Sequence, residues 1–437
     1  MFLTHSKNPW FLLIAGCLLL LLSACGNTPF PQFANTQQIS TAPPPTSTPP
    51  TNIAATSLLT SSCPVHPVPA IMPALPAGSH PNIVYLSERG GLQTTMTAAQ
   101  LIRYDTITKH KTILLSFAQS GEQISDAQIS TNGQWILFLT GSLSQSQTKV
   151  QLIRADGQML QTLLCAPASE IGTLRWSPDS RHAAFAMSGP DGQVSTIQVF
   201  DLTTAHQDVF TASNYRPYAW LDTTRLYIIQ RQSILLTSPQ TLSLLDTSLG
   251  NTHQPVGFTP IASANALCGA FEKSPDSTHL FTSSCTPVDA SGCRGPATQG
   301  PSTLSVRPAT GGSARTIYHS QDQAIMALHP MSSQALLLYI ENTSGNLSQN
   351  GLWKLNTDGS GLTRLTTMVG QQCTDLGYPV LYPQIISRGQ YYALRRVDAT
   401  SSNESLLVGS LNGDKPTIFE TKDTREGVLL LVGVVMR

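Results

Sequence analysis

Residues 176–186, with the sequence WSPDSRHAAFA, contain the pattern that decides the fold. A Ser-Pro-Asp turn leads directly into a short apolar strand, and proline followed by aspartate is the chemistry of a tight hairpin turn. The same phrase returns at 274–281 as SPDSTHLF, and a weaker version stands at 130–138 as STNGQWILF. Further weak copies lie at 220–229, 329–339 and 386–394. A turn followed by a strand therefore recurs along most of the chain.

Each of these units continues with a second pair of strands that has its own turn. The clearest pair spans 351–366, GLWKLNTDGSGLTRLT, in which Asp-Gly separates two short strands. Similar pairs begin at 150, 197 and 406. Four antiparallel strands repeated about every 50 residues are typical of the blades of a β-propeller. The repeat therefore predicts one all-β ring, whereas a length of 437 residues alone suggests two or three domains.

The repeats at 176–185 and 352–366 resemble the TolB-type, WD-like β-propeller family. Blades of that family read roughly as WSPDG, a short apolar strand, a second strand, a DG turn and LT. The other repeats of this chain are degenerate, so the resemblance covers residues 79–437 with two strong anchors. It implies a secreted or envelope propeller, often of six or seven blades, that binds partners. A shared fold does not by itself imply catalysis.

The two ends of the repeat region predict the number of blades. The first unit starts at 82–86, NIVYL, without an inner strand before it, and an apolar strand at 428–435 has no partners after it. If the C-terminal strand supplies the missing inner strand, no sheet edge is left open where the ring closes. Six complete repeats and this shared one make seven four-stranded blades. Six or eight blades, and two separate β-sandwiches, are the alternatives.

The N-terminal segment predicts export and lipid attachment. An apolar run at 10–22 follows Lys7, and its length fits a signal peptide better than a membrane-spanning helix. Residues 22–25, Leu-Ser-Ala-Cys, resemble the lipobox of bacterial lipoproteins, which implies cleavage before Cys25 and a diacylglycerol on its sulfur. The alternative is an ordinary secretory signal. We expect a signal at 1–24, a lipidated linker at 25–78 and the propeller at 79–437, anchored on the outer face of the cytoplasmic membrane.

The linker has two parts of different composition. Residues 41–50, TAPPPTSTPP, predict a stiff, solvated spacer, because proline fixes φ and donates no hydrogen bond. Residues 64–76 are more apolar, which favours contact with the folded domain. The first part is therefore expected to separate the propeller from the membrane, and the second to lie against the propeller.

Eight cysteines bear on the redox compartment. Signal cleavage removes Cys17 and the lipid occupies Cys25, so six thiols remain, and six thiols allow fifteen pairings. Cys268 and Cys285 lie symmetrically about the second Ser-Pro-Asp turn, and Cys293 is the rival partner of Cys285. Disulfides are favoured over free thiols in an exported chain. A metal site is disfavoured, because the sequence has no CxxC and no paired cysteine–histidine spacing.

The composition excludes one class of partner. Lys plus Arg and Asp plus Glu each number 25, so the formal net charge is zero, and charged residues make up only 11% of the chain. Binding to nucleic acid needs a basic stripe that displaces counterions, and this composition does not supply one. A typical soluble domain carries about 25% charged residues. Ser, Thr, Gln and Asn are therefore expected to form most of the solvated turns.

The sequence carries no motif for catalysis or cofactor binding. It contains no GxSxG, HExxH or GxxxxGK[ST] pattern. Asp-Gly pairs at 156, 191 and 358 lie between strands, where turns are favoured over calcium loops. Trp176, Trp220 and Trp353 lie at strand ends, which favours packing between blades over stacking on sugars. Accordingly, we predict no catalytic residue, no cofactor and no metal.

These observations favour a non-catalytic, monomeric, lipid-anchored propeller that binds a protein, peptide or glycan on one face of the ring. Connections after the outer strands and between second and third strands emerge on the same face, so a binding site is expected near 286–303 and 342–350. The alternative is a propeller-class enzyme, a glycan lyase or hydrolase, with Asp126, Glu170 and Glu272 near the central channel. A third interpretation is an accessory or sensory lipoprotein of another envelope complex.

Overall fold

The computed structural model describes residues 62–436 with internal gaps. The described ranges are 62–76, 78, 80–89, 98–117, 122–142, 147–167, 171–188, 194–231, 239–250, 258–265, 270–288, 297–342, 347–367, 384–397, 403–412, 415–423 and 426–436. The predicted signal, Cys25 and the proline-rich spacer lie outside these ranges. No helix within them is long and apolar enough to cross a membrane.

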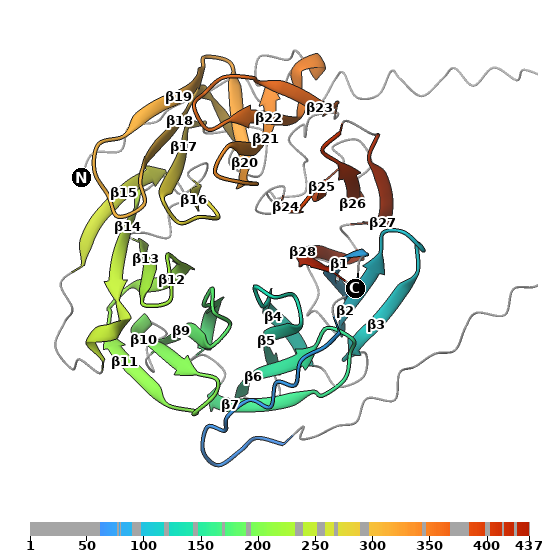
Figure 1. Ribbon diagram of the computed structural model, residues 1–437, viewed down its shortest axis with the longest axis vertical. Helices are drawn as coiled ribbons and strands as arrows, with labels where there is room; N and C mark the ends of the chain where they lie inside the picture. The colour runs from blue at the N-terminus through green and yellow to red at the C-terminus, as the bar shows by residue number, and fades with distance from the viewer. Residues whose placement is uncertain are drawn as a thin grey trace, which may run out of the picture. The chain divides into compact units, whose positions relative to one another are not determined.

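Seven four-stranded antiparallel sheets surround a central axis, and each sheet is one blade (Figure 1). Blades 1 to 4 consist, from the inner to the outer strand, of β28 (Gly427–Met436), β1 (Pro81–Arg89), β2 (Ala98–Asp105) and β3 (Lys111–Ser116); β4 (Glu122–Ile129), β5 (Trp135–Ser142), β6 (Gln147–Arg154) and β7 (Gln161–Pro167); β8 (Ile171–Trp176), β9 (His182–Ser188), β10 (Val194–Asp201) and β11 (Gln207–Thr211); and β12 (Tyr215–Trp220), β13 (Arg225–Arg231), β14 (Pro239–Asp246) and β15 (Thr259–Asn265).

Blades 5 to 7 follow the same plan with β16 (Phe271–Lys273), β17 (His279–Val288), β18 (Ala297–Pro308) and β19 (Arg315–Ser320); β20 (Gln323–Pro330), β21 (Ala335–Asn342), β22 (Gly351–Asn356) and β23 (Thr363–Thr367); and β24 (Gln384–Arg388), β25 (Tyr391–Val397), β26 (Asn403–Ser410) and β27 (Thr417–Asp423). Two short 3-10 helices, η2 (Thr247–Leu249) and η3 (Leu347–Gln349), lie in connections.

The C-terminal strand closes the ring. β28 pairs antiparallel with β1 from Pro81↔Met436 to Arg89↔Gly427, with one bulge between Val84 and Tyr85. Blade 1 thereby receives its inner strand from the end of the chain. The prediction of seven blades closed by this strand is confirmed, and the alternatives of six or eight blades and of two sandwiches are wrong.

The hydrophobic core lies between neighbouring blades. One cluster combines Trp135 and Leu137 of blade 2 with Phe185 and Phe200 of blade 3, all at most 1% exposed. Every residue of β21 is buried, whichever face of the sheet it points from. Because such strands bury both faces, few of their positions can carry a charge. This burial accounts for the low charged fraction of the sequence.

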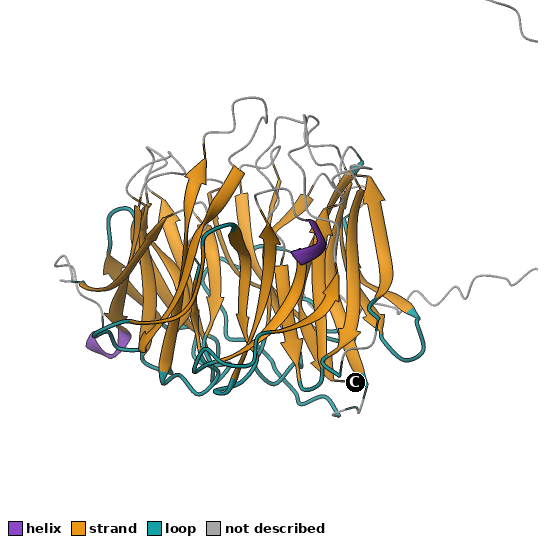
Figure 2. Cartoon of the chain, turned by 90° about the horizontal axis from the view of Figure 1, so that it is seen from above, coloured by secondary structure: helices purple, strands orange, loops and turns teal. Residues whose placement is uncertain are grey.

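The ring has two faces of different character. In each of blades 2 to 7, the turns between first and second strands and between third and fourth strands lie on one face, which we call the turn face. Connections between second and third strands, and from one blade to the next, lie on the opposite loop face. Figure 2 shows the strands running between these two faces. The expected placement of 286–303 and 342–350 on one face follows from this topology.

One expected loop is largely strand. The segment 286–303 was expected to be an insertion, but β17 extends to Val288 and β18 begins at Ala297, so the two strands form a long hairpin. Their pairing continues as far as Val288↔Ala297. Only 289–296 separates the two strands, and those residues lie outside the described ranges. The prediction failed because a run of polar Ser, Thr and Gln reads as loop although the ladder tolerates it.

Polar side chains of one blade accept hydrogen bonds from the unpaired edge of the next blade's inner strand. Asp126 of β4 accepts a hydrogen bond from Leu174 N–H of β8 at 2.9 Å. Gln384 of β24 accepts one from Leu431 N–H of β28, also at 2.9 Å. Unpaired backbone groups at a sheet edge are costly when buried, and a side chain of the preceding blade satisfies them here. Similar contacts join Gln128 to Trp176 N–H and Tyr218 to Phe271 N–H.

Residues 62–76, which we call the strap, lie against blades 2 and 3. A disulfide joins Cys63 to Cys165 of β7, at a sequence separation of 102. Further along the strap, Leu75 hydrogen-bonds the side chain of Gln134 in the β4–β5 turn. The expectation that 64–76 lies against the folded domain is confirmed.

Candidate functional site

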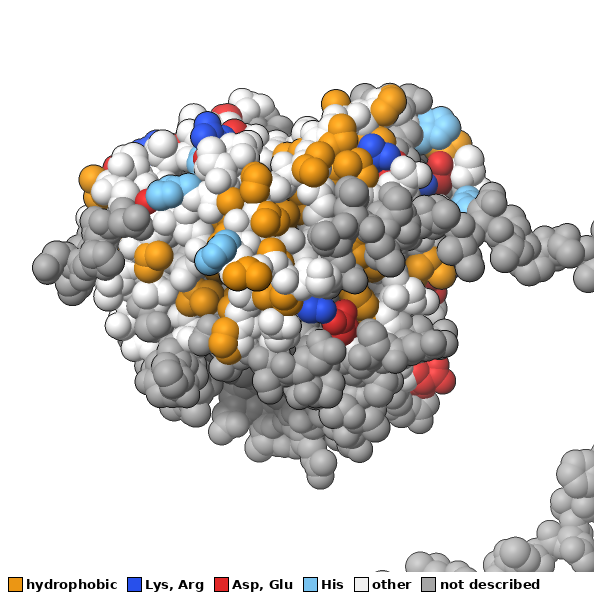
Figure 3. All heavy atoms as spheres, turned by 90° about the horizontal axis from the view of Figure 1, so that it is seen from below, with side chains coloured by type: hydrophobic (Ala, Val, Ile, Leu, Met, Phe, Trp, Pro, Cys, Tyr) orange, Lys and Arg blue, Asp and Glu red, His pale blue; other side chains and the backbone are white. Residues whose placement is uncertain are grey.

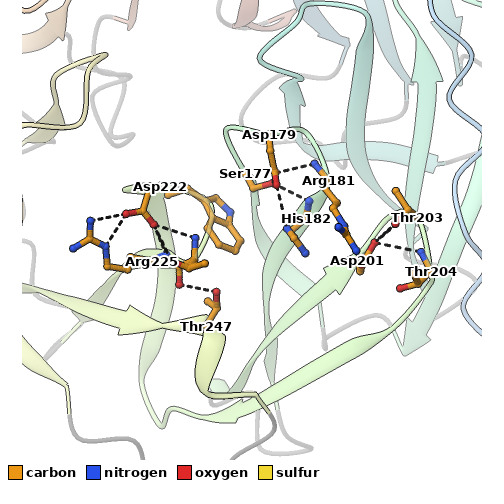
Figure 4. A network of polar contacts seen from close by, with 12 residues as sticks. Ser177, Asp179, Arg181, His182, Asp201, Thr203, Thr204, Asp222, Arg225 and Thr247 are labelled. Atoms are coloured by element: carbon orange, nitrogen blue, oxygen red, sulfur yellow. Dashed lines mark hydrogen bonds and ion pairs between the residues drawn. The ribbon is translucent and has the colours of Figure 1, made fainter.

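The Ser-Pro-Asp turns that revealed the fold have a structural role. Ser177 N–H donates to His182 O at 2.8 Å, and Ser177 Oγ accepts from His182 N–H at the same distance (Figure 4). Asp179 accepts from Arg181 N–H at 3.0 Å. Ser274 and Asp276 repeat this arrangement in blade 5. The motif therefore supplies acceptors for backbone N–H groups of the turn.

Aspartates of the turn face are held by their own turns. Asp201 accepts from Thr203 N–H at 2.8 Å and from Arg181 Nη2 at 2.8 Å (Figure 4). Burial alone raises the pKa of Asp201, but the hydrogen bonds from Arg181 and Thr203 outweigh burial and lower it. Asp222 is held in the same way by Arg225. No group of three His, Cys, Asp or Glu side chains in the described ranges could hold a metal ion.

Ser180 offers a test of this turn chemistry. Its φ is 59°, in the left-handed region, where the weaker repeat has Gly133 with φ 73°. Because glycine adopts this conformation without a Cβ penalty, Ser180→Gly is expected to raise the free energy of unfolding by about 0.5–1 kcal/mol. Urea unfolding measures this change. Ser213→Gly, at an exposed position with ordinary φ, is the control and is expected to lower stability; a decrease in both variants would contradict the prediction.

Two of the three carboxylates expected near the channel lie on inner strands. Asp126 is on β4 and Glu272 is on β16, while Glu170 lies outside the described residues. Arg175 of β8 interacts with both carboxylates: its Nη1 is 3.3 Å from Asp126 Oδ2, and its charge acts to lower the pKa of Glu272. Its Nε donates to the carbonyl of Tyr218 on β12. The two carboxylates are therefore related through one guanidinium.

Glu272 has a raised proton affinity. Burial raises the pKa of Glu272 to about 7, although Arg175 and Lys273 act to lower it. Lys273 donates to Ser277 Oγ at 3.0 Å. Among the described residues none hydrogen-bonds the Glu272 carboxyl. A carboxyl group that titrates near neutrality is able to donate or accept a proton in a reaction.

Glu272 also makes stability depend on pH. Its folded-state pKa of about 7 lies above the ordinary 4.5, so its contribution to stability is complete below pH about 4.5 and is lost as pH rises through about 7. At about 1.4 kcal/mol per tenfold change in proton affinity, the loss is about 3–4 kcal/mol. Glu272→Gln is expected to remove it, so that the variant exceeds the wild type in stability at pH 8 and equals it at pH 4.5. Denaturation at both pH values measures this, with Glu426→Gln as an exposed control; equal stabilities at pH 8 would contradict the prediction.

A serine–histidine contact joins blades 6 and 7. His329 Nε2 of β20 lies 2.9 Å from Ser387 Oγ of β24. Burial lowers the pKa of His329 to about 4, so the imidazole is neutral near pH 7. No carboxylate among the described residues hydrogen-bonds this histidine, so the orienting group of a catalytic triad is missing there. The pair was not predicted, because its members are 58 positions apart in different repeats.

The tryptophans serve in packing. Trp176 and Trp220 are 8% and 3% exposed, so their rings are not open to a ligand. Trp353 is half-buried, and the guanidinium of Arg364 lies over its ring, 5.5 Å from the centroid. This agrees with the prediction of packing over sugar stacking.

The disulfide whose two cysteines are both described does not involve Cys268, Cys285 or Cys293, the cysteines that the sequence analysis singled out. Cys63 and Cys165 form a bond. Cys285 is also disulfide-bonded and is 8% exposed. Cys268 and Cys293, its two predicted partners, lie outside the described residues. The Cys63–Cys165 bond could not be read from the sequence, because six thiols leave all pairings open.

The predicted binding region at 342–350 contains a cluster of amides on the loop face of blade 6. Gln323 Nε2 donates to Gln349 Oε1 at 2.7 Å, and Asn342 Nδ2 donates to the same oxygen at 3.2 Å. Asn342 Nδ2 also lies 3.1 Å from Asp322 Oδ2. Tyr318 donates its hydroxyl to Gln323. We call Tyr318, Asp322, Gln323, Asn342 and Gln349 the amide cluster; its members hold one another in fixed orientations.

Comparison with known proteins supports the fold. No family model and no curated protein matches the chain. Among solved structures, prolyl oligopeptidase B from Galerina marginata is 9% identical with a TM-score of 0.51, covering 79% of this chain and 51% of its own. The β-propeller domain of the Trilobed protease from Pyrococcus furiosus is 9% identical with a TM-score of 0.50, covering 80% and 98%. TolB from Acinetobacter baumannii is 13% identical with a TM-score of 0.40, covering 63% and 62%.

At these identities the likeness concerns the fold alone. The chain spans about half the length of the prolyl oligopeptidase and 62% of TolB. The Trilobed protease domain is described as having an open velcro topology, whereas here β28 pairs with β1 and closes the ring. The chain is a seven-bladed β-propeller of four-stranded antiparallel blades.

Proposed function

We propose that this chain is a lipid-anchored, extracytoplasmic β-propeller that binds a protein, peptide or glycan on its loop face without catalysis. The anchor is supported by the Leu-Ser-Ala-Cys sequence at 22–25 behind an apolar run. Binding is supported above all by the amide cluster, which lies in the region that topology assigns to the loop face.

The chemistry of the amide cluster suits an uncharged ligand with many hydrogen-bonding groups. Gln323 and Gln349 are partly exposed, and their amides are held in fixed orientations before a ligand arrives, which reduces the entropy that binding must overcome. Hydroxyl groups of a glycan and peptide groups of a protein are the natural partners of such amides. The low charged fraction of the chain agrees with recognition that does not depend on charge.

An enzymatic role has one observation in its favour, the raised pKa of Glu272 on an inner strand. A glycan lyase or hydrolase needs an acid or base of this kind. Incubating the protein with a panel of cell-envelope and plant polysaccharides, and separating the products by chromatography, tests it. Turnover that Glu272→Gln abolishes would favour the enzyme, and absence of turnover across the panel favours binding alone.

The binding role is tested with the amide cluster. Gln349→Ala removes the oxygen that orients both Gln323 and Asn342, and is expected to weaken binding to a hit from a glycan or peptide array at least tenfold. Gln334→Ala, an exposed glutamine beside the β20–β21 turn of the same blade, is the matched control on the turn face. Equal affinities for the two variants would contradict a site at the cluster.

The anchor is tested separately. Cys25→Ala removes the only sulfur that the lipobox places at the cleavage site, so the protein is expected to leave the membrane fraction. Fractionation followed by immunoblotting measures this. Unchanged fractionation would contradict the anchor and would leave the binding test unaffected.

A further inference from the structure

The strap is held on blades 2 and 3 as a bound extended peptide would be. Val68 N–H donates to Leu163 O of β7 at 3.0 Å, and Ala70 N–H donates to Leu202 O in the β10–β11 turn at 2.6 Å. These contacts come from two different blades. The strap therefore crosses the boundary between them, in blue beside β6 and β7 in Figure 1.

Two glutamine side chains hold peptide groups of the strap. The Gln161 amide accepts from Ile71 N–H and donates to Ile71 O, both at 2.8 Å. The Gln134 amide makes the same pair of bonds with Leu75, at 3.2 and 3.1 Å. All four bonds engage backbone atoms, so recognition depends on an extended backbone more than on side chains. We call Gln134, Gln161, Leu163, Cys165 and Leu202 the strap site.

The side chains of the strap divide between the core and solvent. Ala70 packs on the hydrophobic cluster of blades 2 and 3, and Leu75 is 9% exposed. Val65, Val68 and Ile71 are 93%, 36% and 59% exposed. Their spacing of three residues is the repeat of a polyproline II helix. One side of the strap therefore seals the core, while apolar side chains with few charges between them are visible on the side of the ring in Figure 3.

We propose that the strap site also accepts the strap of a second copy of this chain whenever its own strap is not closed by the Cys63–Cys165 bond. A second copy has the same sequence, so it supplies the same backbone groups and the same apolar side chains to Gln134 and Gln161. Exchange of an identical element between copies needs no new contact. This association differs from partner binding at the loop face, because the strap site lies on the outer strand β7 and on turns of the turn face.

The disulfide decides which copy occupies the strap site. Without it, a chain's own strap competes by virtue of a high effective concentration, and a second strap competes as the protein becomes concentrated. With it, the strap is covalently held on its own propeller. The monomer that the sequence predicts is therefore the form closed by Cys63 and Cys165.

A covalent trap detects the exchange. When Cys63 of one copy lies on the strap site of another, its sulfur meets Cys165 of that copy. Each thiol loses one proton, and two electrons pass to oxidised glutathione, which yields one S–S bond between the copies and two glutathione thiols. The reaction is the same as the one that closes the strap within one chain.

The experiment mixes two variants of the full chain in detergent. Cys63→Ser, labelled with ¹⁵N, offers only Cys165 at the strap site, and unlabelled Cys165→Ser offers only Cys63. After oxidation with glutathione and digestion, mass spectrometry is expected to find a Cys63–Cys165 peptide whose halves differ in isotope. Absence of this peptide, while the wild-type chain forms its own bond under the same conditions, would overturn the proposal.

A second pair of variants separates docking from random collision. Adding Gln161→Ala to the Cys63→Ser chain removes a clamp on the strap, and is expected to lower the yield of the mixed peptide at least fivefold. Gln158→Ala is the matched control, because Gln158 lies in the β6–β7 turn, shortly before Gln161, and contacts Arg154 rather than the strap. Equal yields for Gln161→Ala and Gln158→Ala would show collision alone and would overturn the proposal.

Discussion

Replacing Glu404 by alanine is expected to lower the free energy of unfolding by about 3–5 kcal/mol, because it removes the carboxylate of a buried ion pair. Glu404 of β26 is 0% exposed, and the side chain of Arg395 on β25 is 3% exposed. Arg395 Nε donates to the carboxylate. Burial raises the pKa of Glu404, while Arg395 and the N–H of Leu429 act in the opposite direction.

The same carboxylate also holds the closing strand. Glu404 accepts a hydrogen bond from Leu429 N–H of β28, which belongs to blade 1. Alanine at 404 therefore removes an ion pair within blade 7 and a contact between the first and last blades. The effect is expected to exceed that of an exposed pair such as Arg225–Asp222, whose partners are 40% and 34% exposed.

Urea unfolding followed by tryptophan fluorescence measures this loss. The double variant Arg395→Met with Glu404→Leu is the informative control, because it removes both charges and fills similar volume. It is expected to recover most of the stability lost in Glu404→Ala. A loss below about 1 kcal/mol in the single variant would contradict the prediction.

The fold was predictable because its signals are local. The Ser-Pro-Asp turns at 177–179 and 274–276 mark blades through hydrogen bonds that span only five residues. The unpartnered strand at 428–435 indicated ring closure, since an open sheet edge would have been costly. The apolar composition of 64–76 placed the strap against the domain. Each of these inferences needed only a neighbouring stretch of sequence.

The site was less predictable because its contacts join distant repeats. Asp126 and Glu272 were correctly expected on inner strands, but nothing in the sequence shows that Arg175 interacts with both. The pairs His329–Ser387 and Arg395–Glu404 depend on how blades meet and on which strands bury their charges. Segment 286–303 was read as a loop, because polar strands that project beyond the core carry no apolar alternation.

The bond between Cys63 and Cys165 is expected to contribute about as much to the free energy of unfolding as Glu404 does. It closes a loop with a sequence separation of 102, for which the chain-entropy model gives about 4.7 kcal/mol and measured native disulfides about 2–5 kcal/mol. The double variant Cys63→Ser with Cys165→Ser is therefore expected to unfold at lower urea, with a loss of about 3–4 kcal/mol. A reductant is unsuitable for this measurement, because Cys285 is also disulfide-bonded.

Loss of this bond is also expected to change the folded protein, because the strap covers part of the core. Ala70 and Met72 cover the cluster that contains Trp135 and Leu163, and without the covalent bond only the strap's non-covalent contacts keep them there. A fluorescent probe of apolar surface is expected to bind the double variant more strongly than the wild type before unfolding begins. The variant Gln161→Ala, which keeps the disulfide, separates the two contributions: it weakens the docking and leaves the loop closed. If the double variant unfolded at the wild-type midpoint, the bond would contribute nothing and the strap would be held by its hydrogen bonds and packing alone.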